Sequence, residues 1–226
     1  MKKSFLSLLF LFVSLFVYAQ ECTTTWPYLY SDFSEGKVYY KSGNTESKFM
    51  NIYILGNKLH FIEGENIVEL KSANNIAKIE ILKERYLPFE EKFYQIISEG
   101  DQGGYLALLA TGDLTALQDN SGAYGSSSNS MSTNSLSSLE FVIGRSILTG
   151  NISHMQIRNN KDSGKSIPLL KKYFFITGGN VLAAKAKDVE NSLPDAQKKK
   201  EFKTFVKANK IKWNNPTDLA KLLAIL

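Results

Sequence analysis

Short apolar runs separated by turn residues fill the chain between positions 36 and 110. Each run is five to seven residues long and rich in Ile, Val, Phe and Tyr, which favours strands over helices. The connections are too short for crossover helices, so neighbouring strands must run antiparallel. The pattern predicts strands at Lys37–Lys41, Phe49–Leu55, Lys58–Ile62, Ile67–Lys71, Ile76–Leu82, Phe93–Ser98 and Tyr105–Ala110.

Glycine-containing turns place the hairpins of this sheet. Gly56-Asn57, Gly64-Glu65 and Gly178-Gly179 each separate two apolar runs by two residues, which is the spacing of a tight hairpin turn. Glycine suits such turns because it adopts positive φ without a steric penalty. Further strands are expected at Leu139–Ile143, Ile152–Ile157, Lys172–Thr177 and Asn180–Ala184.

The run Phe49–Leu55 is apolar on both faces of its predicted strand. Met50, Ile52 and Ile54 point to one side, while Phe49, Tyr53 and Leu55 point to the other. A sheet built from such strands has to be covered on both sides. A sandwich, a barrel-like sheet and a sheet crossed by a helix all satisfy this condition.

Beyond residue 184 the apolar positions follow the period of a helix. The first predicted helix carries Phe202, Phe205 and Val206 on one face, and Pro194 suits its first position because proline has no N–H to leave unpaired. Asn215 is expected to cap a second helix. The apolar face of that helix consists of leucines, namely Leu219, Leu222, Leu223 and Leu226.

These patterns predict an α+β protein with a largely antiparallel β-sheet body, sandwich or barrel-like, followed by two or three short C-terminal helices. We expect a signal peptide at 1–19, a β-rich domain at 20–183 and a helical segment at 184–226 packed on the sheet. Residues 112–138 are rich in Ser, Asn and Gly and have little apolar area to offset the entropy of ordering, so they are expected to form a flexible loop.

The first nineteen residues have the pattern of a secretory signal peptide. Lys2 and Lys3 precede an apolar run from Phe5 to Val17, and Val17-Tyr18-Ala19 forms a plausible cleavage site. The run is shorter than the roughly 20 apolar residues that a membrane span needs. We therefore expect cleavage after Ala19, export to the periplasm or the cell surface, and no transmembrane segment in the mature chain.

Cys22 is the one cysteine of the 226-residue chain. A single thiol makes no intramolecular disulfide, so the fold has to rest on an apolar core. Cysteine-based zinc and redox sites are excluded for the same reason. Glu21 disfavours lipoprotein processing, which needs a small residue directly before the cysteine.

Charge divides the chain into an acidic and a basic part. Residues 20–144 contain 9 Lys or Arg and 16 Asp or Glu, a net −7, whereas residues 145–226 contain 16 and 6, a net +10. Lysines at helical spacing are the candidate contact for an anionic partner: Lys199, Lys203, Lys207 and Lys210. Outside the cytoplasm this partner would be an acidic protein, an acidic glycan or anionic lipid headgroups, and not a nucleic acid. Ordinary solvated surface is the alternative interpretation.

No motif in the chain predicts a catalytic, cofactor or metal site. His60 lies in a predicted strand, where a packed side chain is expected, and His154-Met155 on a strand would point to opposite faces, which disfavours copper binding. Neighbouring carboxylates such as Glu63 and Glu65 fit solvated charge better than the opposed pair of a glycosidase. Gly164-Lys165-Ser166 resembles the end of a phosphate loop but lacks the upstream glycine.

Three segments carry a family resemblance. They are Phe33-Ser34-Glu35-Gly36-Lys37-Val38, the hairpin from Asn51-Ile52-Tyr53 to Lys58-Leu59-His60-Phe61-Ile62, and the stretch from Glu201 to Ile211 that leads to Asp218-Leu219 and Leu222-Leu223. In these the chain resembles a group of uncharacterised secreted proteins of Bacteroidetes. The resemblance covers most of the mature chain and implies a β-rich body with a helical C-terminus. It implies no known reaction, ligand or catalytic residue.

The expected function is that of a secreted, non-enzymatic envelope protein that acts by binding. The alternative is a carboxylate-dependent hydrolase of envelope glycans, which would need two opposed carboxylates from distant strands across a concave site.

Overall fold

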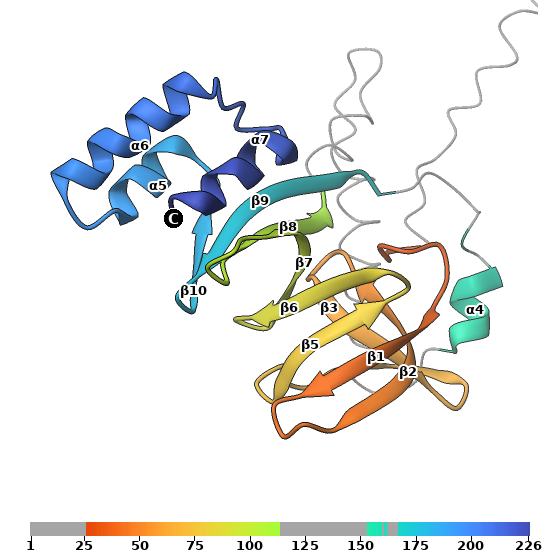
Figure 1. Ribbon diagram of the computed structural model, residues 1–226. Coiled ribbons are helices and arrows are strands. Elements are labelled where there is room, and N and C mark those ends of the chain that lie inside the picture. The colour runs from red at the N-terminus through yellow and green to blue at the C-terminus, as the bar shows by residue number, and fades with distance from the viewer. Residues whose placement is uncertain (1–25, 114–152, 160, 162–166) are drawn as a thin grey trace, which may run out of the picture.

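A computed structural model of the chain describes residues 26–113, 153–159, 161 and 167–226 (Figure 1). Several expectations fall outside these residues. They are the signal peptide, Cys22, the strand at Leu139–Ile143, Gly164-Lys165-Ser166 and the expected loop 112–138 apart from its first two residues.

In the described part of the chain, ten strands form one continuous sheet in which every neighbouring pair is antiparallel. Their spatial order is β10-β9-β8-β7-β6-β5-β1-β2-β3-β4. The strands are β1 Ser34–Tyr40, β2 Thr45–Tyr53, β3 Lys58–Glu63, β4 Asn66–Glu69, β5 Ile76–Ile81, β6 Glu84–Phe89, β7 Lys92–Glu99, β8 Tyr105–Gly112, β9 Leu169–Thr177 and β10 Asn180–Ala183. Short helices follow the sheet, which confirms the predicted α+β class with an antiparallel β-rich body.

Two of the three predicted hairpin turns have the expected form. Glu63 pairs with Asn66, and Thr177 pairs with Asn180, so two residues connect each pair of strands. Gly178 and Gly179 have φ of 56° and 77°, as a type I′ turn requires. The prediction of a two-residue turn at Gly56-Asn57 is wrong. Tyr53 pairs with Lys58, four residues lie between them, and Asn57 takes the positive φ, at 51°.

The prediction of a strand at Ile152–Ile157 is also wrong. Within its described part the chain forms helix α4, His154–Asn159. A helix this short is marginal in water and depends on tertiary contacts. Ile157 is buried against the aromatic cluster beside it, and Arg158 Nε lies 3.4 Å from Asp32 Oδ1. These contacts select the helix over the local strand preference.

The sheet curls so strongly that β3 contacts β7, although four strands lie between them (Figure 1). The inner face of the curl is the first hydrophobic core. Its larger members are Met50, Ile52, Leu59, Phe61, Ile76, Ile79, Ile81, Tyr86 and Phe93. β6, which the sequence pattern missed because it contains two charged residues and a proline, contributes Tyr86 to this core.

Asn57 joins the two sides of the curl at the β2–β3 turn. Its buried side chain accepts a hydrogen bond from the Phe93 N–H at 2.6 Å and donates one to the Ala110 carbonyl oxygen at 3.1 Å. Next to it, the Gly112 N–H donates to the Ile54 carbonyl oxygen at 2.9 Å. The curl is therefore held by loop-to-strand hydrogen bonds in addition to its apolar core.

The outer face of β2 and β3 is covered only along part of its length. Asn51, Tyr53 and His60 are buried there beneath residues 26–33 and α4, and the Asn51 amide donates to the carbonyl oxygens of Tyr30 and Asp32 at 2.8 and 3.0 Å. Phe49 lies beyond this cover and is 55% exposed. The expectation that Phe49 is buried is therefore wrong.

The C-terminal helices form the second hydrophobic core with β8 and β9. They are α5 Ala186–Ser192, α6 Ala196–Ala208, α7 Pro216–Ala220 and the 3-10 helix η1 Lys221–Ala224. Leu106 and Phe175 face them from the sheet, and Phe202 is buried with the leucines of α7 and η1. Phe205 is only half-buried.

The caps of these helices agree with the sequence in one case and differ in the other. The Asn215 side chain accepts hydrogen bonds from the N–H groups of Thr217 and Asp218 at 2.9 and 3.3 Å, which confirms the predicted cap of α7. Helix α6 begins at Ala196 and not at Pro194. The Asp195 carboxylate accepts from the Lys198 N–H at 2.7 Å and fixes that start.

Candidate functional site

The lysines predicted to contact an anionic partner lie on and just beyond helix α6. Lys199, Lys203 and Lys207 are one turn apart within α6. Lys210 follows the C-cap residue Asn209 and has a φ of 49°, so it lies in the turn after the helix. The structure thus brings three of the four lysines onto one helical stripe and places the fourth at its end.

Sequence reasoning missed a further member of this stripe. Lys200 precedes Lys203 and Lys207 by three and seven residues, which places it on the same side of the helix. The consecutive lysines 198–200 were the available signal. We call Lys199, Lys200, Lys203, Lys207 and Lys210 the basic face of α6.

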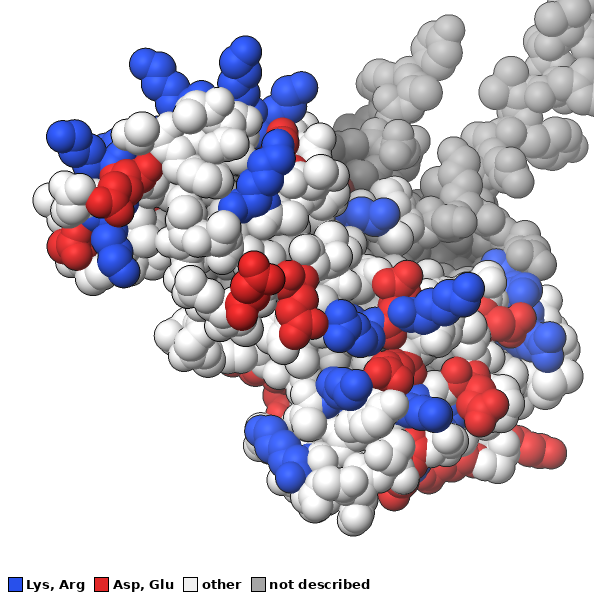
Figure 2. All heavy atoms as spheres, viewed as in Figure 1, with Lys and Arg blue, Asp and Glu red and all other residues white. Residues whose placement is uncertain are grey.

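Most cations of the basic face of α6 have no acidic partner among the residues that the structure describes. Lys203 Nζ lies 2.8 Å from Glu190 Oε1 of α5. Among the described residues, no carboxylate lies within salt-bridge distance of Lys199, Lys200, Lys207 or Lys210. Figure 2 shows lysine and arginine side chains extending from the helical end of the molecule, whereas both signs of charge are interspersed over the β body.

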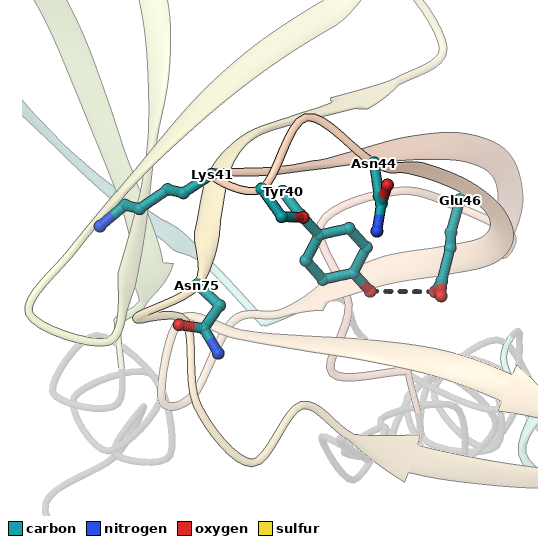
Figure 3. Close-up of a pocket in the computed structure, with 6 residues that line it drawn as sticks. Tyr40, Lys41, Asn44, Glu46 and Asn75 are labelled. Atoms are coloured by element: carbon teal, nitrogen blue, oxygen red, sulfur yellow. Dashed lines mark hydrogen bonds between the residues drawn. The ribbon is translucent and has the colours of Figure 1, made fainter.

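A shallow hollow lies at the β1–β2 hairpin, on a different part of the molecule (Figure 3). Its volume is about 540 Å³, and its lining residues are Tyr40, Lys41, Ser42, Asn44, Glu46 and Asn75. The Lys41 N–H donates to the Asn75 carbonyl oxygen at 2.8 Å, which joins the hairpin to the loop before β5. Tyr40 Oη donates to Glu46 Oε2 at 2.9 Å. Burial, and next the hydrogen bond to Glu46, raise the pKa of Tyr40.

Two carboxylates of the β body, Glu80 and Glu91, accept hydrogen bonds from neighbouring groups. Glu80 accepts from Lys78 at 2.8 Å and from Tyr39 at 2.7 Å, and these bonds, that of Lys78 first, lower its pKa. Glu91 accepts from the Ala73 N–H at 3.1 Å. The hollow at the β1–β2 hairpin contains one carboxylate, that of Glu46, whereas a glycosidase needs two.

His60 forms a buried hydrogen-bonded chain with Tyr28 and Glu69. His60 Nδ1 lies 3.0 Å from Tyr28 Oη, and His60 Nε2 lies 3.3 Å from Glu69 Oε2. Both ring nitrogens of His60 are paired when the neutral ring donates a hydrogen bond from Nε2 to the Glu69 carboxylate and accepts one from the Tyr28 hydroxyl at Nδ1. The His60 side chain is 0% exposed and Tyr28 is 5% exposed, so neither ring is open to solvent, whereas the Glu69 side chain is 29% exposed. The hydrogen-bonded chain ties the N-terminal segment to β3 and β4.

This buried chain predicts a loss of stability in acid. Burial lowers the pKa of His60 despite the attraction of Glu69, and the hydrogen bond from His60 lowers the pKa of Glu69. The unfolded chain therefore takes up protons at a higher pH than the folded chain. We expect the free energy of unfolding to fall below about pH 6.5, and to fall further below about pH 4.3 as Glu69 also protonates, with a slope of at most about 1.4 kcal/mol per pH unit for each group.

The measurement is the urea midpoint of the wild type and of His60→Gln between these pH values. Burial lowers the pKa of His154 too, so His154 also reduces stability in acid, and it does so in both proteins. A smaller slope in His60→Gln is the expected result, and equal slopes would contradict the assignment to His60.

Within the described ranges, no group of three or more His, Cys, Asp or Glu side chains is placed to hold a metal ion. Among the described helices, none has the length and apolarity needed to cross a membrane. Comparison of the chain with family models, curated proteins and solved structures found no match.

Proposed function

We propose that this chain is an exported, non-enzymatic binding protein of the bacterial envelope that attaches to an anionic surface through the basic face of α6. The observation that carries the proposal is the surplus of unpaired cations. Residues 196–212 contain seven lysines and one acidic residue, Glu201, and within the described part of the chain only Lys203 of the basic face of α6 forms an ion pair. A surplus of this size attracts anions over a Debye length of about 8 Å at physiological salt.

The shape of this region favours an extended anionic surface over a small ligand. Helix α6 lies at the edge of the molecule, on the side of α5 and α7 away from the curled sheet (Figure 1). Lysine is a point charge on a flexible stem, without the fixed geometry that arginine offers to a single bound phosphate. A row of such charges fits repeated anionic groups, as in phospholipid headgroups or an acidic glycan.

Charge reversal on the basic face of α6 is expected to weaken attachment strongly. A lysine near an anionic membrane contributes roughly 1 kcal/mol, so replacing Lys199, Lys203, Lys207 and Lys210 by Glu should weaken binding at least about a hundredfold. Binding to lipid is measured by sedimentation with vesicles of phosphatidylglycerol and phosphatidylcholine. Binding to an acidic glycan is measured in parallel with polygalacturonate beads. Binding of the wild type should decrease as salt is raised.

The matched control reverses four exposed lysines of the β body: Lys37, Lys71, Lys83 and Lys92. It has the same net charge as the test variant but keeps the basic face of α6 intact, so it should retain most of the binding. A version of the test variant that keeps Lys203 preserves the ion pair with Glu190 and controls for helix stability. Equal loss in both quadruple variants, or no wild-type binding at low salt on either probe, would refute the proposal.

A further inference from the structure

The hollow at the β1–β2 hairpin has the side-chain chemistry of a site for a polar, uncharged ligand. Its volume of about 540 Å³ lies within the usual range of ligand pockets. Such pockets are mostly apolar, but here Tyr40 is the only aromatic or aliphatic hydrophobic residue among the six that line it. An apolar ligand would leave these polar groups unpaired, which is costly.

The polar groups of the hollow provide both donors and acceptors. Within the described part of the chain, the side-chain amides of Asn44 and Asn75 form no hydrogen bond, so both remain available to a ligand. Each amide can donate and accept at once. Asn75 reaches the hollow from a different loop than Asn44 does, so a ligand would be held from two sides (Figure 3).

Glu46 and Tyr40 line one wall of the hollow and are hydrogen-bonded to each other. Glu46 Oε2 accepts from the Tyr40 hydroxyl at 2.9 Å and also lies 3.6 Å from Lys48 Nζ. The second carboxylate oxygen remains an acceptor for a ligand hydroxyl. The bond to Glu46 also orients the Tyr40 ring, whose face offers an apolar surface beside the polar groups.

The charge of the hollow argues against an ionic ligand. One cation, Lys41, and one anion, Glu46, line it. Figure 3 shows the Lys41 side chain extending away from Tyr40 and Glu46. An anion would be repelled by Glu46, and the charge of Glu46 is already offset in part by Lys48 Nζ at 3.6 Å, so neither sign of ligand charge is favoured.

We infer that this hollow binds a neutral sugar residue, with its hydroxyls on Asn44, Glu46 and Asn75 and its C–H face against Tyr40. This site is separate from the basic face of α6 and independent of the function proposed for it. A pyranose ring combines vicinal hydroxyls with an apolar C–H face, which is the combination that an aromatic ring beside amides and a carboxylate recognises.

The experiment follows the side-chain amide resonances of Asn44 and Asn75 by NMR during titration. The probes are methyl α-glucoside, methyl α-mannoside, methyl β-N-acetylglucosaminide and, as the anionic comparison, glucuronate. At least one neutral glycoside should shift both amides, and Tyr40→Ala should weaken that binding by at least about tenfold, a loss of 1.4 kcal/mol. Asn75→Ala is a second test, because its side chain has no partner in the described structure whose loss would disturb folding.

Tyr39→Ala is the matched control. Tyr39 is the neighbouring residue of β1, and its hydroxyl donates to Glu80 at 2.7 Å as that of Tyr40 does to Glu46, but it does not line the hollow. It should leave glycoside binding unchanged. The inference is overturned if no neutral glycoside shifts the amides, if glucuronate binds more tightly than the glycosides, or if Tyr39→Ala and Tyr40→Ala lose binding equally.

Discussion

Replacing Phe175 by alanine is expected to lower the free energy of unfolding by about 4 kcal/mol. The Phe175 side chain is 0% exposed, pairs across β8 and β9 with Leu106, and faces the helices of the second hydrophobic core. Its removal leaves a cavity between two layers that cannot easily approach each other. Urea denaturation followed by circular dichroism measures the change.

Phe49→Ala is the matched control for this prediction. Phe49 is also a strand phenylalanine, but it is 55% exposed on the outer face of β2. Its replacement should cost less than about 1 kcal/mol. Equal effects of the two substitutions would mean that the helices do not pack on β8 and β9 as described.

Asn57→Ala is expected to cost about 3 kcal/mol. The substitution leaves the Phe93 N–H and the Ala110 carbonyl oxygen without their partner inside the protein, and unpaired buried polar groups cost about 1–3 kcal/mol each. It also places alanine at a φ of 51°, which asparagine tolerates better.

Two further variants separate these causes. Asn57→Gly removes the backbone strain and keeps the loss of hydrogen bonds, so it should be more stable than Asn57→Ala by up to about 1 kcal/mol. Asn57→Asp retains an acceptor for the Phe93 N–H but no donor for Ala110. If all three variants unfold at the wild-type urea concentration, the turn does not hold the curl of the sheet.

The strands were predictable where apolar residues and glycine turns coincide. Ile79 and Ile81 in β5, for example, are buried as their alternation indicates. β6 was missed because Glu84, Arg85 and Pro88 disfavour a strand locally. Cross-strand pairing of Tyr86 with Ile79 and Gln95 overrides that preference, and a local pattern cannot show it.

Helix α4 and the cover of β2 depend on contacts between distant segments. Asp32 holds Arg158 and Lys161 across more than a hundred residues of sequence. The exposure of Phe49 follows from where residues 26–33 end their cover of the sheet, and not from the composition of β2 itself. The spacing of apolar residues within one segment does not reveal such contacts with distant segments.

The two candidate sites also differ in how far the local sequence predicts them. The basic face of α6 is local, so helical spacing alone predicts that Lys199, Lys203 and Lys207 lie together. The hollow at the β1–β2 hairpin is not local, because Asn75 comes from another loop and is held there by its backbone bond to Lys41. Likewise, Tyr28, His60 and Glu69 come from three separate segments.

Lysine footprinting on anionic vesicles tests the proposed attachment most directly. An amine-acylating reagent is applied to the wild-type protein with and without phosphatidylglycerol vesicles, and modification at each lysine is read by mass spectrometry. We predict protection of the basic face of α6, at Lys199, Lys200, Lys203, Lys207 and Lys210, with unchanged modification of Lys37, Lys71, Lys83 and Lys92. Protection of the β-body lysines instead, or uniform modification of all lysines by vesicle-bound protein, would contradict attachment through α6.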